Sequence, residues 1–137
     1  MMECDLYKPI GDFLRSRGND LVAFEVPQRH GSPRRIDVVG TTQDGEPMVS
    51  VEAKLGHFNR AFEQAAQRLF VSDYVYLSFQ EEYAHRALSL RRHDLCASGI
   101  GLISVNETAT ELLSPHLSVY VNPVRRQRCV EVLRSMV

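Results

Sequence analysis

The sequence predicts an α/β protein in which helices cover both faces of a mixed central sheet. Its second half alternates strand and helix patterns, an order that requires a parallel crossover, and its first half contains a strong antiparallel hairpin signal. With 137 residues, 44% of them hydrophobic and 24% charged, the chain has the size and composition of one globular domain. We therefore expect a single domain over residues 1–137, with a core at about 6–105 and a C-terminal edge strand and helix at about 117–136.

The N-terminal segment has the pattern of an amphipathic helix that ends at a glycine. Asp5 is a candidate N-cap, and Gly18 with Asn19 is a stop signal. The stripe of apolar residues at helical spacing consists of Leu6, Ile10, Phe13 and Leu14. Leu21 to Val26 then alternates apolar and other residues, which predicts a strand. We therefore expect a helix followed directly by the first strand of the sheet.

The next segment predicts a β-hairpin. Two β-branched runs, Ile36 to Thr41 and Met48 to Leu55, flank Gln43 to Glu46, which contains an Asp-Gly pair. A two-residue turn and a four-residue loop give the same register, with Asp37 directly opposite Glu52. One face is then apolar and suits the core: Ile36, Val38, Val49, Val51, Ala53 and Leu55. The other face carries Arg35, Asp37, Glu52 and Lys54.

The polar face of this hairpin suggests phosphoryl chemistry. Two carboxylates directly opposite each other repel, and a divalent cation would compensate, since Mg²⁺ is commonly held by one or two carboxylates. Lys54 lies beside them and could stabilise charge on a phosphate. The sequence contains only two lysines, Lys8 and Lys54. The alternative is a solvated sheet face with weak surface salt bridges.

The rest of the chain alternates helix and strand patterns. The expected helices and strands, in order, are a helix at Asn59–Val71, a strand at Tyr74–Phe79, a helix at Glu81–Leu95, a strand at Gly99–Val105, an edge strand at Leu117–Val121 and a helix at Val124–Met136. The last helix opens at Asn122-Pro123. It carries four arginines, which we interpret either as a phosphate-contacting face or as a solvated helix surface: Arg125, Arg126, Arg128 and Arg134.

The pattern Ile36-Asp37, a hairpin, then Glu52-Ala53-Lys54 resembles the motif of the PD-(D/E)xK nuclease superfamily, which includes restriction endonucleases and Holliday-junction resolvases. The expected order of elements resembles the αβββαβαβ core of that restriction endonuclease-like fold. The resemblance implies that Asp37, Glu52 and the carbonyl of Ala53 hold Mg²⁺, while Lys54 lies near the attacking water and the scissile phosphate. Ile36 stands where the family name expects proline, a position that varies among members.

The resemblance also implies roles around this motif. Gln64 resembles in position a glutamine that helps hold the substrate in several of these families, and Glu3 lies on the helix where some relatives place an extra acidic ligand. Apart from the resemblance, the loop Pro27–Pro33, which is followed by Arg34-Arg35, could contact a nucleic-acid backbone, and His57 lies close enough to the motif to reach a phosphate. For each position the alternative is a solvated side chain without a role.

Other features limit the possible functions. No apolar run reaches the roughly 18 residues of a membrane span, and the N-terminus lacks the pattern of a signal peptide, so we expect a cytoplasmic protein. The three cysteines have no zinc or disulfide spacing, and the net charge of −1 counts against a large non-specific nucleic-acid surface. We expect a Mg²⁺- or Mn²⁺-dependent endonuclease acting on DNA, which would need a homodimer to cut both strands. The alternative is a catalytically silent module that binds DNA or assembles with protein.

Overall fold

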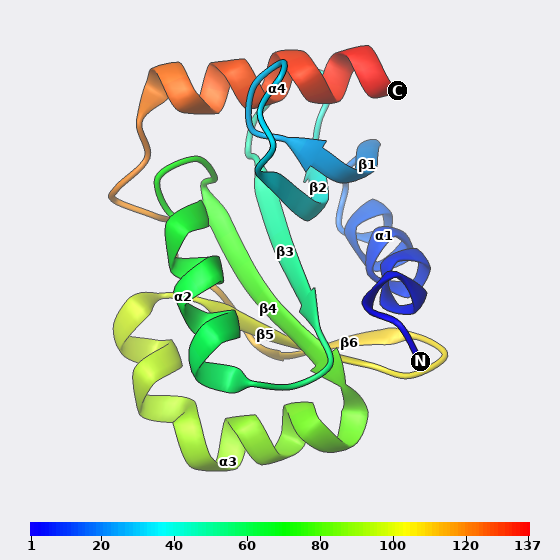
Figure 1. Ribbon diagram of the computed structural model, residues 1–137, viewed down its shortest axis with the longest axis vertical. Coiled ribbons are helices and arrows are strands. Elements are labelled where there is room, and N and C mark those ends of the chain that lie inside the picture. The colour runs from blue at the N-terminus through cyan, green and yellow to red at the C-terminus, as the bar shows by residue number, and fades with distance from the viewer.

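The computed structural model describes residues 1–137 as a six-stranded mixed sheet between helices (Figure 1). The strands follow one another in space in the order β1 to β6, and their bounds are β1 Leu21–Pro27, β2 Arg35–Thr41, β3 Val49–Lys54, β4 Tyr74–Gln80, β5 Gly101–Val105 and β6 Ala109–Leu113. The pairs β3/β4 and β4/β5 are parallel, and the other neighbours are antiparallel. The predicted α/β class with a mixed sheet is confirmed.

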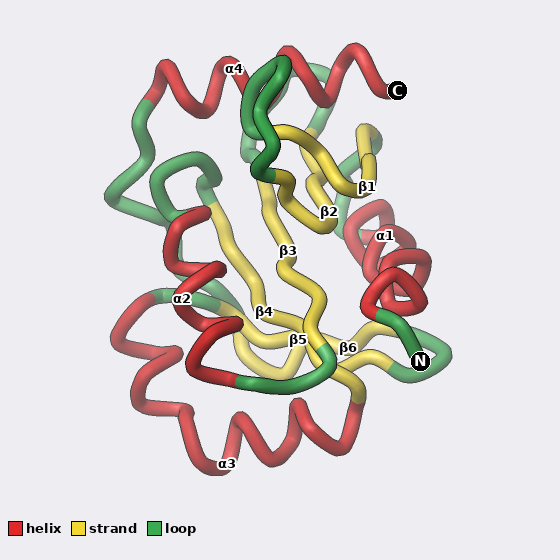
Figure 2. Tube along the Cα trace, viewed as in Figure 1, coloured by secondary structure: helices red, strands yellow, loops and turns green.

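Helices lie on both faces of this sheet (Figure 2). A short 3₁₀ turn, η1, precedes four α-helices, and the bounds are η1 Glu3–Leu6, α1 Tyr7–Ser16, α2 Phe58–Arg68, α3 Glu81–Ser98 and α4 Pro123–Met136. Helix α1 covers one face, while α2, α3 and α4 pack on the other. None of the helices combines the length and the apolar composition needed to cross a membrane.

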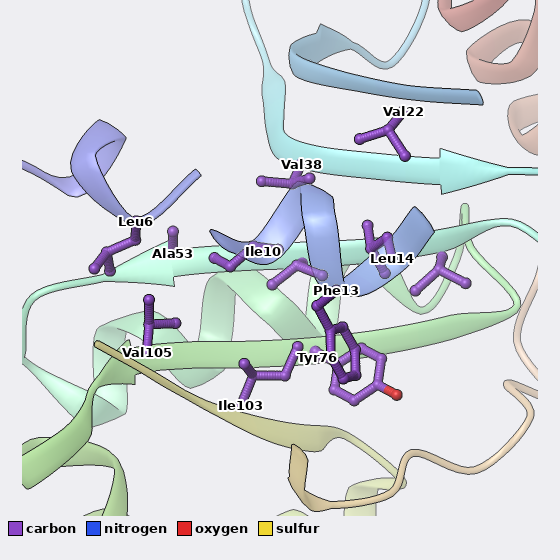
Figure 3. Close-up of a cluster of buried hydrophobic side chains, with 12 residues drawn as sticks. Leu6, Ile10, Phe13, Leu14, Val22, Val38, Ala53, Tyr76, Ile103 and Val105 are labelled. Atoms are coloured by element: carbon purple, nitrogen blue, oxygen red, sulfur yellow. The ribbon is translucent and has the colours of Figure 1, made fainter. Parts of the chain in front are cut away.

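The predicted apolar stripe of α1 is buried against the hairpin strands (Figure 3). Ile10 and Leu14 are almost completely buried, and they contact a cluster that includes Val38, Val51 and Ala53. Complete burial of one such Leu or Ile side chain contributes about 1.5–3 kcal/mol. This packing fixes α1 across β2 and β3, next to the polar residues of the hairpin.

Two residues of the predicted core face lie elsewhere. Ile36 packs against α4 instead of α1, and Leu55 lies beyond the end of β3 with 39% of its surface exposed. The ladder between β1 and β2 omits the pair of Glu25 and Asp37, and Glu25 has a left-handed backbone with φ of 50°. The pairing of the two strands is therefore irregular at this point: Val22 and Val38 pack in the cluster of α1, whereas Val26 and Ile36 pack in the cluster of α4.

The predicted hairpin register is correct, but its connection is longer than expected. Val38 pairs with Val51, the register that sets Asp37 opposite Glu52, yet the strands are joined by residues 42–48. Helix α4 fixes this connection: the guanidinium of Arg126 donates to the carbonyl of Gly45 at 2.9 Å, and that of Arg134 donates to the carbonyl of Gln43 at 2.9 Å. Two of the four C-terminal arginines therefore have a structural role.

The prediction of an edge strand at Leu117–Val121 is wrong, because the edge strand is β6 at Ala109–Leu113. A tight turn explains the difference: the amide of Asn106 donates to the carbonyl of Thr108, and the chain returns at once beside β5. Residues 117–121 instead run past the connection between α2 and β4, where the amide of Ser118 donates to the carbonyl of Asp73 at 2.7 Å.

The prediction that Asp5 is the N-cap of the first helix is also wrong. Asp5 lies inside η1, and its carboxylate accepts a hydrogen bond from the amide of Met2 at 2.7 Å. By contrast, the last helix begins where the sequence predicts, and Asn122 caps it, because its side-chain oxygen accepts hydrogen bonds from the amides of Val124 and Arg125. The remaining elements agree with their predicted ranges to within a few residues.

Candidate functional site

The site forms where the pairing of β2 and β3 ends. The regular ladder stops at Val38 and Val51, one residue before Asp37 and Glu52. Beyond it, Oδ2 of Asp37 accepts a hydrogen bond from the amide of Ala53 at 2.8 Å. A carboxylate thus takes the place of a main-chain acceptor, and the strands separate into a gap that polar side chains fill.

Glu52 is the most deeply buried charged group of this gap. It is only 1% exposed, and its Oε2 accepts from the amide of Asp37 at 3.2 Å. Its Oε1 is 3.1 Å from Nη2 of Arg68, which reaches it from α2. The same nitrogen of Arg68 donates to the carbonyl of Arg35 at 3.0 Å, whereas its Nε is buried without a hydrogen-bond partner. Arg68 therefore compensates the buried charge of Glu52 and retains one unsatisfied donor.

Lys54 and the N-terminal segment complete the surroundings of Asp37. The ammonium of Lys54 lies 3.9 Å from Oδ2 of Asp37 and 3.9 Å from Oε1 of Glu3. On the other side, the hydroxyl of Tyr7 donates to Oδ1 of Asp37 at 3.3 Å. Both oxygens of Asp37 are therefore positioned by the protein, from β3 and from α1.

Most of the sequence-predicted site residues share one pocket. None of the eight residues that line it is hydrophobic, and they are Arg34, Arg35, Asp37, Glu52, Lys54, Gln64, Gln67 and Arg68. The structure thus brings Asp37, Glu52, Lys54, Gln64 and Arg35 together.

Two predicted residues lie beside this pocket and contribute differently. His57 is exposed and lines a neighbouring pocket, which shares Lys54 and Gln64 with the first and also includes Glu3. Ala53 has a completely buried side chain, and only its main chain can reach the site. The amide of Ala53 donates to Asp37, and the N–H and C=O of one strand residue point to the same side, so the carbonyl is expected on that side of β3 as well.

The pocket leaves negative charge on Asp37 only partly compensated. Burial, followed by the negative charge of Glu52, raises the pKa of Asp37 from 3.8 to about 6. The amide of Ala53 and the ammonium of Lys54 act in the opposite direction, and Glu3 adds a further repulsion. Burial and the neighbouring carboxylate of Asp37 also raise the pKa of the Tyr7 hydroxyl, which therefore remains a hydrogen-bond donor.

The donor set is compatible with a hard divalent cation held by few protein ligands. No group of three or more His, Cys, Asp and Glu side chains is placed to hold a metal ion. Two carboxylates, Asp37 and Glu52, line the pocket. Mg²⁺ typically uses one or two carboxylates and keeps water and phosphate oxygens as its other ligands, so the residues present fit this ion.

Arg68 and Tyr7 were missed by sequence reasoning, although both carry a signal. Arg68 follows Gln64 by one helical turn, so the two side chains share a face of α2. Tyr7 precedes Ile10 and Leu14 at helical spacing and so points toward the hairpin. Either signal can be interpreted only when the strand that the helix covers is known, and helical periodicity alone does not identify that strand.

Comparison with known proteins supports the fold. No family model matches the chain, and no curated protein matches it. Among solved structures, the chain is similar to the SPO1766 protein of unknown function from Silicibacter pomeroyi, with a TM-score of 0.73 and 17% sequence identity. The match covers 99% of this chain and 86% of that one. At this identity the likeness concerns the fold alone.

Proposed function

We propose that the pocket is the active site of a metal-dependent nuclease of the PD-(D/E)xK type, with a restriction endonuclease-like fold, that hydrolyses phosphodiester bonds in DNA. One observation carries the proposal: two carboxylates and an ammonium group, on Asp37, Glu52 and Lys54, meet in a pocket without hydrophobic lining where two strands separate. Like charges are placed together here at a cost in stability, and such costs are concentrated at functional sites.

Asp37, Glu52 and the carbonyl of Ala53 would hold Mg²⁺ or Mn²⁺. All three are oxygen donors, which these hard cations prefer. The raised pKa of Asp37 supports the assignment, because a bound cation would offset both causes of the rise, the burial of the carboxylate and its repulsion by Glu52. When bound, the metal supplies polarisation of the phosphate and a lower pKa for a water molecule.

The remaining residues would act on the substrate directly. Lys54 holds its ammonium 3.9 Å from Asp37, where it can stabilise negative charge that develops on a phosphate. Gln64 and Arg35 line the same pocket and can donate hydrogen bonds to phosphate oxygens. His57 is in the neighbouring pocket with Lys54, so we assign it at most a contact with a flanking part of the substrate.

A second candidate, a catalytically silent module that binds DNA or protein, is favoured by one specific observation. Arg68 already pairs with Glu52 at 3.1 Å and supplies part of the positive charge that a metal would otherwise bring. In this alternative, Arg68 and Lys54 stabilise the two acids without a cation. Metal binding therefore discriminates between the two functions.

The direct test is incubation with duplex, single-stranded, nicked and branched DNA in the presence of Mn²⁺. We expect the wild type to cleave at least one of these substrates and Lys54→Ala to lose the activity. Lys8→Ala is the matched control, because Lys8 is the only other lysine and its side chain is 86% exposed on α1. Cleavage that persists in Lys54→Ala would locate the activity outside this pocket.

Calorimetric titration with Mn²⁺ separates the enzyme from the silent module. We expect the wild type to bind the ion and Asp37→Asn to lose this binding, because one of two carboxylate ligands is removed. Absence of Mn²⁺ binding by the wild type would favour the silent module. Cutting both strands of a duplex requires two such sites, so a homodimer is part of the proposal, and a monomer mass at micromolar concentration would contradict it.

A further inference from the structure

A second polar pocket lies between α4 and the loop that connects β1 to β2, which rises against that helix (Figure 1). Four arginines line it, two from the loop and two from the helix: Arg29, Arg34, Arg125 and Arg128. No acidic or hydrophobic residue contributes to its lining. Residues almost 100 positions apart in the chain are thus brought together into one concentration of positive charge.

This charge is not compensated within the protein. None of the four arginines lies within ion-pair distance of a carboxylate, whereas Arg17, Arg68 and Arg126 elsewhere in the chain each pair with an acid. The whole chain has a net charge of −1, so the cluster is a local excess and not a consequence of a basic protein. Four guanidinium groups around one pocket are the arrangement that binds phosphate, because each can donate paired hydrogen bonds to its oxygens.

The pocket is also held in shape before any ligand binds. Nη2 of Arg125 donates to the side-chain oxygen of Gln28 at 3.3 Å, and its guanidinium lies 5.8 Å from the centre of the Phe70 ring. The loop is closed by a hydrogen bond from the amide of Gln28 to the carbonyl of Arg34 at 3.2 Å, and the hydroxyl of Ser32 accepts from the amide of Arg34 at 3.2 Å. Because these groups are already ordered, less conformational entropy is lost when a ligand binds.

Arg34 connects this pocket to the candidate active site. It lines both pockets, and Arg35 continues the row of positive charge toward Asp37. A single phosphate would occupy only one of the two pockets. A chain of phosphates could contact Arg128 and Arg29 at one end and reach Lys54 at the other.

We propose that the arginine pocket binds the phosphate backbone of the DNA strand whose scissile phosphate enters the candidate active site. The inference rests on the proposed function, which identifies the bound strand as the substrate. It adds the path of that strand, which runs from the carboxylate pocket, past Arg34, to α4. The contacts are to phosphate and not to bases, so they position the strand without reading its sequence.

The test is fluorescence anisotropy with a labelled 20-nucleotide single strand and the corresponding duplex, in EDTA so that no cleavage occurs. In Arg29→Gln/Arg128→Gln we expect affinity to fall about tenfold or more for both probes, by the same factor for different base sequences. The slope of log affinity against log salt concentration should become shallower by roughly one for each phosphate that the variant no longer binds. Both arginine side chains are exposed and have no hydrogen-bond partner, so the variant is expected to fold.

The matched control is Arg86→Gln/Arg92→Gln, which removes the same charge from the exposed surface of α3, outside both pockets. It should leave the salt slope unchanged. An equal fall in affinity in the control, an unchanged slope in Arg29→Gln/Arg128→Gln, or no DNA binding by the wild type would each overturn the inference. So would a mononucleotide or inorganic phosphate that binds as tightly as the strand, because the pocket would then take a small anion.

The outcome is separable from that of the proposed nuclease. Binding that depends on Arg29 and Arg128, in a protein that does not cleave with Mn²⁺, would support the arginine pocket and contradict the enzyme. Cleavage that depends on Lys54 but with binding independent of Arg29 and Arg128 would support the enzyme and contradict the arginine pocket.

Discussion

Replacing Asp37 by asparagine should stabilise the metal-free protein at neutral pH. The carboxylate of Asp37 is largely buried beside Glu52, with Glu3 as a further acid, and the amide of Ala53 and the ammonium of Lys54 compensate only in part. Asparagine has nearly the same shape, and its oxygen can still accept from the amide of Ala53. The substitution therefore removes the unfavourable charge and keeps the main hydrogen bond.

The magnitude follows from the pKa of Asp37. Its rise from 3.8 to about 6 on folding corresponds to about 3 kcal/mol, because one pH unit of displacement equals about 1.4 kcal/mol. A folded-state pKa above the unfolded value means that the favourable contribution is complete below pH 3.8 and is lost as the pH rises through about 6. The stability advantage of Asp37→Asn should thus grow from about 2 kcal/mol at pH 5 to about 3 kcal/mol at pH 8.

Urea denaturation in EDTA, at several pH values between 5 and 8, measures the difference in unfolding free energy between Asp37→Asn and the wild type. Asp12→Asn, which removes one negative charge from the exposed face of α1, controls for the change in net charge. A difference between Asp37→Asn and the wild type that is constant over this range would refute the reasoning. A wild type that is the more stable protein at pH 8 would refute it as well.

Three further predictions concern the buried groups of the fold. Arg68→Met should destabilise the protein by about 3–5 kcal/mol in urea denaturation, because it leaves Glu52 buried without its partner. A second substitution, Glu52→Gln, should recover much of that stability. Unfolding free-energy changes of the two substitutions that simply add would contradict the pairing. Burial raises the pKa of the Cys129 thiol to about 12, so a thiol reagent at pH 8 should label the two exposed cysteines of the native protein and reach Cys129 only after denaturation; labelling of all three at equal rates would contradict its burial. Gly101→Ala should lower the free energy of unfolding by about 1–3 kcal/mol, since the added Cβ would lie 2.7 Å from a carbonyl of β6. Gly56→Ala, whose added Cβ would have its nearest neighbour at 3.7 Å, should lower it much less. Equal effects of the two substitutions would rule out this close approach as the cause.

The charged residues that line the two pockets are mostly basic, and the only acids among them are Asp37 and Glu52. Acids and a lysine meet where β2 and β3 separate, and uncompensated arginines gather against α4. A chain with a net charge of −1 can therefore still present a basic track to DNA. The low net charge is then no argument against a nucleic-acid substrate, provided that the strand follows this track.

Local patterns of the sequence determined the hairpin and its register. The Asp-Gly signal and the period of two along each strand are properties of neighbouring residues, so the opposition of Asp37 and Glu52 could be predicted without any tertiary contact. The helices and parallel strands that followed could be predicted for the same reason. The pattern of 36–41 could not show that Ile36 packs against α4, because the change of face coincides with irregular pairing at Glu25, which belongs to a different strand.

Tertiary structure alone decided what surrounds these residues. Arg68 reaches Glu52 because α2 crosses back over β3, and Arg125 meets Gln28 because α4 packs on β1 and on the loop that connects β1 to β2. Sequence periodicity reports which face of a helix is apolar, but it contains no information on which distant segment that face will cover. The two acids were therefore predictable from the sequence, while their charge partner and the arginine pocket followed only from the packing of helices on the sheet.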